Sequence, residues 1–162
     1  MPSFIQALPL ALACAAWALT GAAAAAELKL VGLKGEVRLV GETELKAMPR
    51  VRLKLEPRDI ASFEGVPLGD LLAKTGLAKI DGVRGPMLAV VIVVRASDGY
   101  VVALPLSDLD PAFRSGRIVL ADTWNDKPLA ADEGPFHLIV EGDARPARSA
   151  HSVVSIELRS LR

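Results

Sequence analysis

Residues 63–76 read FEGVPLGDLLAKTG, and this stretch decides the fold class because it marks both ends of a short helix. Pro67 stands at the start and Gly76 at the end, which are the positions where proline and glycine favour helix initiation and termination. Between them lie three leucines with the spacing of one buried helical stripe: Leu68, Leu71 and Leu72. The stretch therefore predicts a two-turn helix that packs against a core.

Outward from this helix the sequence predicts short strands and turns. The expected strands are residues 27–33, 36–40, 51–56, 87–94, 100–104, 117–121, 136–140 and 152–158. Residues 87–94 (MLAVVIVV) are continuously apolar, which predicts a central strand buried on both faces. Asp98-Gly99 is typical of a tight turn, residues 125–128 form a second turn, and residues 141–150 are expected to be mostly loop.

Two further short helices are expected, at residues 43–48, capped by Thr43 and ended by Pro49, and at residues 105–113. The strands do not alternate with helices of crossover length, so a doubly wound parallel sheet is not expected. The predicted fold class is a mixed α+β domain with a mostly antiparallel sheet and short helices.

The N-terminal 26 residues differ from the rest in composition. They contain no charged residue, whereas all 19 Lys and Arg and all 19 Asp and Glu fall in residues 27–162. Residues 7–19 are largely apolar, and the alanines at 24–26 supply a small-residue cleavage pattern, so we expect residues 1–26 to be a signal peptide and residues 27–162 the domain. Two alternatives stay open, an uncleaved membrane anchor and a lipoprotein modified at Cys14.

In each case the domain is expected outside the cytoplasm, in the periplasm or secreted. Cys14 is the single cysteine of the chain, so residues 27–162 have no thiolate for catalysis, metal ligation or a disulfide. The zero net charge argues against a nucleic-acid partner. A membrane partner is expected only if the leader is uncleaved or lipidated, and a periplasmic protein partner remains open.

Candidate chemical groups are few. Arg145, Arg148 and His151 form the best anion-binding constellation, because the forked donors of arginine suit phosphate. The alternative for these three is a solvated basic loop. His137 lies within an apolar strand and is expected to face outward. The acidic residues Asp122, Asp126, Asp132 and Glu133 fit no calcium-loop pattern and are expected to be solvated.

Four segments, taken in order, carry a resemblance to a known family: Phe63–Leu77, Ala96–Leu109, Leu120–Phe136 and Gly142–Leu158. They resemble the patterns F-x-G-V-P-L-x-x-L-L, S-x-D-G-Y, G-x-P-L-x-x-x-x-G-P-x-R-L-V-V-P-G and A-R-x-V-K, with Glu141-Gly142 in place of the P-G and His151 in place of the final basic residue. Together they resemble the oxidoreductase molybdopterin-binding domain, the central domain of sulfite oxidases, in a short exported bacterial form.

The resemblance implies a truncated sulfite oxidase-type fold and, in full-length relatives, a molybdenum–pterin cofactor that performs oxygen-atom transfer. It places Asp98, Tyr100, Arg145, Arg148 and His151 in the cofactor-binding site. A pterin or another anionic small molecule is therefore the expected ligand.

One departure from the family pattern decides the function expected. Catalytic relatives hold molybdenum with a cysteine thiolate, and the corresponding residues 52–58 (RLKLEPR) contain none. No metal ligand and no catalytic residue is therefore assigned, and a metal-bound form is not expected. The favoured function is a binding or accessory module, and the alternatives are an oxidoreductase with atypical metal ligation and a structural domain that binds a protein partner.

Overall fold

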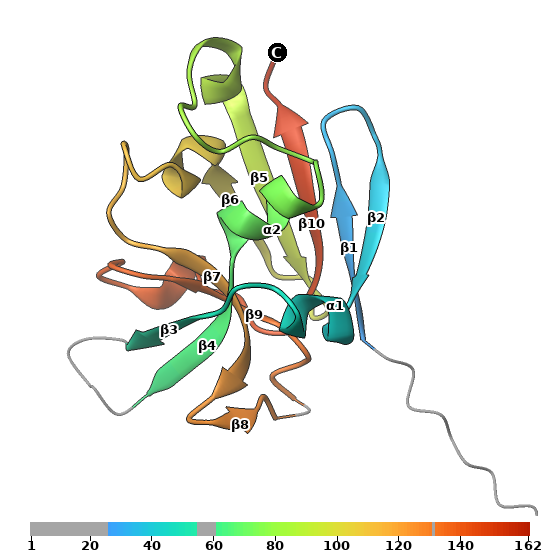
Figure 1. The fold of residues 1–162 in the computed structure, drawn as a ribbon, viewed down its shortest axis with the longest axis vertical. Coiled ribbons are helices and arrows are strands. Elements are labelled where there is room, and N and C mark those ends of the chain that lie inside the picture. Colours follow the sequence, from blue (N-terminus) through green and yellow to red (C-terminus); the bar gives the residue numbers. More distant parts are fainter. Residues whose placement is uncertain (1–25, 55–60, 131) are drawn as a thin grey trace, which may run out of the picture.

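The computed structural model describes residues 26–54, 61–130 and 132–162 and places their strands in two five-stranded sheets (Figure 1). The elements along the chain are β1 (Glu27–Val31), β2 (Val37–Gly41), α1 (Glu42–Lys46), β3 (Val51–Lys54), β4 (Ser62–Pro67), α2 (Leu68–Lys74), the 3-10 helix η1 (Gly85–Ala89), β5 (Val90–Ala96), β6 (Val101–Pro105), the 3-10 helix η2 (Leu106–Leu109), β7 (Ile118–Trp124), β8 (Lys127–Pro128), β9 (His137–Val140), the 3-10 helix η3 (Pro146–Arg148) and β10 (Val153–Ser160).

The first sheet has the order β2-β1-β10-β5-β6, so the last strand of the chain lies at its centre beside the first. Only the pairing of β1 with β10 is parallel among the described strands, and the others are antiparallel. In the second sheet β4 runs along one edge of the long strand β7, while β9 and β8 share its other edge. The predicted mixed, mostly antiparallel α+β class is confirmed.

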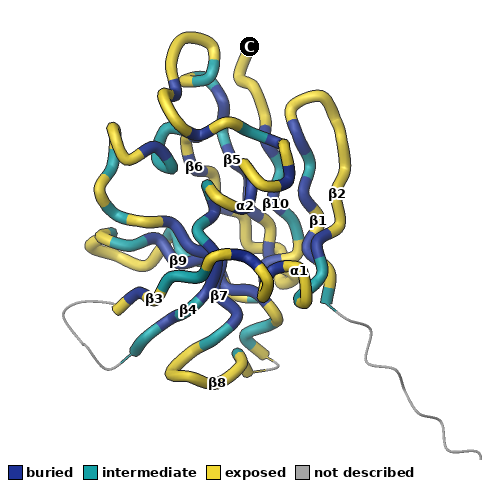
Figure 2. Tube along the Cα trace, viewed as in Figure 1, coloured by how far each residue is buried: buried dark blue, intermediate teal, exposed yellow. Residues whose placement is uncertain are grey.

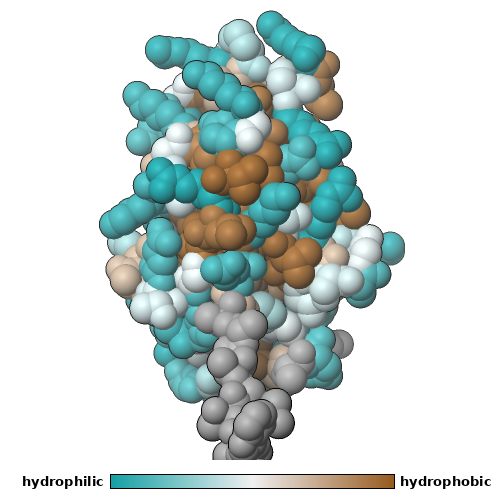
Figure 3. All heavy atoms as spheres, turned by 90° about the vertical axis from the view of Figure 1, so that its right-hand side faces the viewer, coloured by the Kyte–Doolittle hydropathy of each residue, from teal (hydrophilic) through white to brown (hydrophobic). Residues whose placement is uncertain are grey.

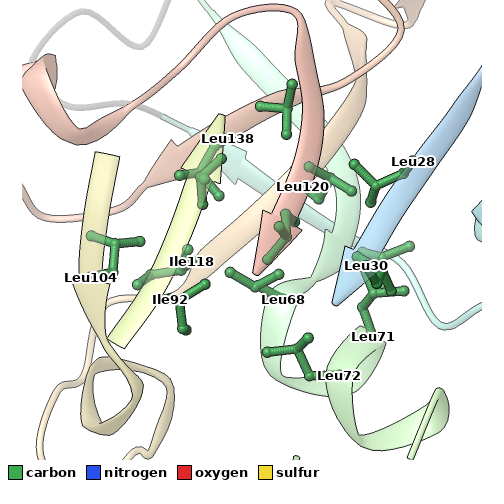
Figure 4. Close-up of a cluster of buried hydrophobic side chains, with 14 of the residues drawn as sticks. Leu28, Leu30, Leu68, Leu71, Leu72, Ile92, Leu104, Ile118, Leu120 and Leu138 are labelled. Carbon is green, nitrogen blue, oxygen red and sulfur yellow. The ribbon is translucent and has the colours of Figure 1, made fainter. Parts of the chain in front are cut away.

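The main core lies between the two sheets and is closed by α2 (Figures 2 and 4). Its central side chains come from both sheets and from the helix: Leu28, Leu30, Leu68, Leu71, Leu72, Ile92, Leu104, Ile118, Leu120 and Leu138. The predicted leucine stripe of α2 is confirmed, because all three of its leucines are buried. A second, smaller cluster covers the opposite face of the second sheet: Leu53, Phe63, Val119, Ala121 and Ile139.

Several predicted elements have different boundaries. Residues 85–89 form η1, so the apolar strand begins at Val90 and not at Met87. Arg95 of β5 is exposed, so burial of this strand is complete on one face only, as expected for a sheet with one side toward solvent. Of residues 105–113 only Leu106–Leu109 are helical, because Pro111 cannot continue the hydrogen-bonding pattern.

Two local predictions about turns and caps also change. Thr43 does not cap the first helix, which starts one residue earlier after Gly41 and has no side-chain cap. The expected loop 141–150 contains η3 and an isolated bridge between Leu138 and Ala150. The leader, apart from Ala26, and the end of the predicted strand 51–56 lie outside the described residues. None of the helices described has the length and hydrophobicity to span a membrane.

Candidate functional site

Four charged side chains from three separate segments meet in one group, which we call the arginine cluster: Asp108, Arg114, Asp143 and Arg148. Arg148 donates from Nε and Nη2 to the two carboxylate oxygens of Asp143, at 2.7 and 2.6 Å, and from Nη1 to Asp108 at 3.0 Å. Arg114 donates to Asp143 at 3.1 Å and to the carbonyl of Glu141. The hydrogen bonds from Arg148, aided by Arg114, hold the pKa of Asp143 below its usual value.

The loop that carries Arg114 is fixed by a buried carboxylate. Asp110 follows η2 directly and accepts hydrogen bonds from the backbone N–H groups of Val83 and Ala112, both at 2.9 Å. These bonds lower the pKa of Asp110, so the carboxylate stays charged and holds the turn at Pro111 in place. Arg114 is thereby directed toward the loop that follows β9.

A cleft lies beside the arginine cluster and consists of two adjoining cavities of about 570 and about 210 Å³. The two cavities share residues 114–117, and the larger also reaches Glu141 and Gly142. Arg117 at the rim donates from its backbone N–H and from Nε to Glu141, at 2.8 and 3.1 Å. Each arginine of this rim therefore has a carboxylate partner, so the cleft offers both guanidinium donors and carboxylate acceptors.

A second contact brings three aromatic rings together, and we call it the histidine contact: Phe63, His137 and His151. The ring centroids of His137 and His151 are 3.8 Å apart with a tilt of 34°, and Phe63 meets His137 edge-on at 5.2 Å. His137 is only 4% exposed, and its Nδ1 has no hydrogen-bond partner among the described residues. Burial, with a smaller contribution from His151, lowers the pKa of His137 to about 4.

The expectation that His137 faces outward is therefore wrong. All four residues of β9 are buried, because the main core covers one face of this strand and the second cluster covers the other. The expectation that Asp122 is solvated is also wrong. It lies on β7, is 8% exposed and pairs with Arg50. Burial works to raise the pKa of Asp122, but hydrogen bonds from Arg50 and Thr123 outweigh it and lower the pKa.

The structure brings together some of the residues predicted for the site and separates others. Arg148 belongs to the arginine cluster, and Tyr100 donates its hydroxyl to the carbonyl of Ala147 at 2.6 Å, directly beside it. Asp98 accepts a hydrogen bond from the backbone N–H of Tyr100 and so shapes the hairpin turn. Arg145 is exposed, and the ring of His151 stacks on His137. No ligand contact tests these five residues, so their role remains a prediction.

Comparison with known proteins defines the class of fold. No family model matches the sequence, and no curated protein matches it. Among solved structures, the fold is similar to the sulfane dehydrogenase SoxCD from Paracoccus pantotrophus, with a TM-score of 0.60 over 83% of this chain. The identity is 17%, and this chain spans 38% of the length of that one. The fold of this chain is therefore similar to part of a longer dehydrogenase chain, in agreement with the sulfite oxidase-type fold expected.

The sequence of residues 27–162 offers no cysteine thiolate to a molybdenum centre. Within residues 26–54, 61–130 and 132–162 no three His, Cys, Asp or Glu side chains converge to hold a metal. Residues 52–54 of the segment expected to carry the cysteine are strand residues with outward charges, and residues 55–58 lie outside the described part. The charges of Arg114, Arg117 and Arg148 are already matched by carboxylates, which does not favour a further strongly anionic group.

Proposed function

We propose that the chain is a binding or accessory domain of the molybdopterin-domain type, and not an oxidoreductase that carries its own metal. Two observations support the relationship, namely the ordered motifs from Phe63 to Leu158 and the fold shared with the sulfane dehydrogenase. The observation that carries the proposal is the sequence of residues 27–162, which contains no cysteine to serve as the soft ligand that anchors the metal in the resembling family.

The cleft beside the arginine cluster is the proposed binding site. Its rim alternates guanidinium donors with carboxylate and carbonyl acceptors, because Arg114 and Arg117 both lie against Glu141. A ligand with donors and acceptors on one planar edge matches such a rim better than a free phosphate, whose charge would meet the carboxylates. The pterin ring system has this character, so a pterin without stoichiometric metal is the ligand proposed.

Metal and pterin content test the proposal directly. The full chain, with residues 1–26, is expressed in a host that makes the molybdenum cofactor, and the purified protein is analysed for molybdenum by mass spectrometry and for pterin by fluorescence. We expect pterin with molybdenum far below one atom per chain. Stoichiometric molybdenum would instead support an oxidoreductase with atypical ligation, and the absence of both would favour a structural domain that binds a protein.

Variants locate the ligand on the protein. Arg117→Ala removes a rim donor of the cleft, and Arg95→Ala removes an exposed arginine of β5, on the other sheet, that makes no ion pair within the described residues. We expect the first to lower pterin content severalfold and the second to leave it unchanged. Arg148→Ala is compared only after thermal unfolding shows that it folds, and unchanged binding there would remove Arg148 from the site.

Export is part of the proposal and rests on the uncharged, apolar leader. Fractionation of cells that express the full chain is expected to place the domain in the periplasm or the medium, with a mass that lacks the leader. Recovery with the membrane and with the leader intact would support the anchor instead.

A further inference from the structure

Strand β2 is an edge of the first sheet, and it exposes apolar side chains on either side of a single charged residue, Arg38. Val37 and Leu39 are 55% and 57% exposed, and the strand contains no proline. The opposite edge, β6, ends in Pro105 and is tied to η3 through the Tyr100 hydroxyl. Figure 3, which looks onto the β1–β2 side, shows apolar groups gathered there between charged ones. An exposed apolar edge of this kind is a template for pairing with another strand.

The free hydrogen-bonding groups of this edge can be identified from the hairpin. Gly32 donates its backbone N–H to the carbonyl of Glu36 at 2.9 Å, so Glu36 and every second residue after it direct their backbone groups toward β1. The backbone groups of Val37 and Leu39 therefore point away from the sheet. They can form the ladder of a further antiparallel strand.

We propose that β2 pairs antiparallel with β2 of a second copy of this chain, about a two-fold axis, and so joins two first sheets into one. Such an interface is self-complementary, because every residue contact occurs twice. The inference does not depend on the proposed pterin site, which lies on the other sheet and its loops.

The charges on β2 select the register of the pairing. A two-fold axis at Arg38 would place Arg38 opposite its own copy, and an axis at Leu39 would place Glu36 opposite Glu42. An axis at Val37 places Glu36 opposite Arg38 twice. Like charges directly opposite one another destabilise a strand pair and opposite charges stabilise it, so the axis at Val37 is favoured.

Local geometry leaves room for this register. The Oε2 atom of Glu36 accepts a hydrogen bond from the backbone N–H of Lys34 at 2.9 Å, and the carboxylate lies over Gly32, so the side chain has to turn toward the edge to reach the partner's arginine. Leu39 would lie opposite Gly35 of the second copy. The space where a side chain of Gly35 would stand is empty, with no atom within 4 Å, so the leucine has room.

Sedimentation velocity of the full chain over a range of concentrations tests the proposal. A pairing of a few residues buries little area, so we expect a weak dimer with a dissociation constant of about 100 μM. Arg38→Glu or Glu36→Arg alone should raise that constant at least about tenfold, and the two together should restore it. Val101→Asp, on the opposite edge strand of the same sheet and 47% exposed, should leave it unchanged.

Val37→Asp provides a second route if a charge reversal prevents folding, which circular dichroism would show. It places two carboxylates opposite each other at the axis, and Val37 is exposed enough for the fold to accept the change. The expected result is a monomer. A wild-type chain that stays monomeric at the highest concentration, or a dimer that none of these variants weakens, overturns the proposal. Single variants that dissociate without rescue by the double variant overturn the register.

Discussion

The arginine cluster and the histidine contact both include residues from the C-terminal quarter of the chain but are stabilised in opposite ways. In the cluster each charge has a partner, and Arg148 keeps 37% of its side chain in water. In the histidine contact His137 is almost fully buried, its Nδ1 has no hydrogen-bond partner in the part of the chain that the structure describes, and its surroundings hold the ring uncharged. Charged groups are thus kept at the surface where partners exist, while the buried ring depends on staying neutral.

Replacing one glycine in each region by alanine should reveal the largest difference in lost stability between the two regions. Gly134 lies beside the histidine contact, and a Cβ there would be 2.5 Å from the Cα of Ser152. Gly142 lies beside the arginine cluster, and a Cβ there would be 3.7 Å from Nη2 of Arg114. Both have positive φ, so Gly→Ala costs about 1 kcal/mol at each from backbone strain. The backbone overlap at Gly134 should bring its total to about 4 kcal/mol.

Urea unfolding of Gly134→Ala and Gly142→Ala, measured side by side, checks this expectation. Since the two residues share the same backbone conformation, the second variant serves as the matched control for the strain of the first. Equal losses of stability would show that the segment next to Ser152 can move, and that the two regions are equally tolerant.

As the pH falls, the two regions should lose their contributions to stability in different pH ranges. The pKa of His137 is about 4 in the folded chain against an ordinary 6.5, so the unfolded state binds the proton first as the pH falls. The stability associated with the neutral ring is present above pH 6.5 and is lost as the pH falls to about 4. The shift corresponds to about 3 kcal/mol. The pKa of Asp143 is lowered from 3.8, so the cluster loses stability only below that pH.

Chemical unfolding at several pH values between 7 and 4 measures this loss. His137→Phe keeps a ring against Phe63 and His151 but cannot be protonated, so its unfolding free energy should be nearly flat between pH 7 and about pH 5. Below that range both chains also lose the stability of Glu64, Glu141 and Glu157, whose pKa values are lowered by hydrogen bonds from arginines. Arg148→Ala should retain the wild-type slope. A wild-type chain whose stability does not change between pH 6.5 and 4.5 would contradict the assignment of His137 as the acid-sensitive group.

The parts of the fold that local sequence determines were predictable. The helix α2 was found because its proline, glycine and leucines act within two turns of each other. The prediction that His137 faces outward was wrong because it assumes that one face of the strand is exposed to solvent. Both faces of β9 are covered by segments from elsewhere in the chain. Asp122 was misplaced because its partner Arg50 is 72 positions away.

Of the four residues of the arginine cluster the sequence singles out only Arg148, for the same reason. Short motifs pointed to Arg148 and Tyr100. Asp108, whose carboxylate Arg148 contacts, is 40 positions away in the sequence, and Arg114 is 29 positions from its partner Asp143. No local pattern marks such pairs. The equal numbers of acidic and basic residues are consistent with arginines that pair with carboxylates. Only the fold shows which carboxylate lies against which arginine.

The smallest effect is expected where the β5–β6 hairpin meets the arginine cluster. Tyr100 donates its hydroxyl to the carbonyl of Ala147, yet the side chain is 46% exposed, so water can replace the lost partner. Tyr100→Phe should therefore lower stability by about 0.5 kcal/mol, at the low end for a hydrogen bond. It should leave the slope between pH 7 and 4 unchanged, because the phenol does not contact the histidines.

The Tyr100→Phe variant also tests whether the β5–β6 hairpin sets the position of η3. If the bond only adds stability, Tyr100→Phe and Arg148→Ala should have additive effects on unfolding, since water would restore the carbonyl's partner in either background. If the bond sets the position of η3, the two changes should couple, because Ala147 and Arg148 are neighbours on one short turn. A double-mutant cycle with a coupling above about 0.5 kcal/mol would show that Tyr100 positions Arg148. A loss of stability for Tyr100→Phe as large as that for Gly134→Ala would contradict the argument that water replaces the lost hydrogen bond.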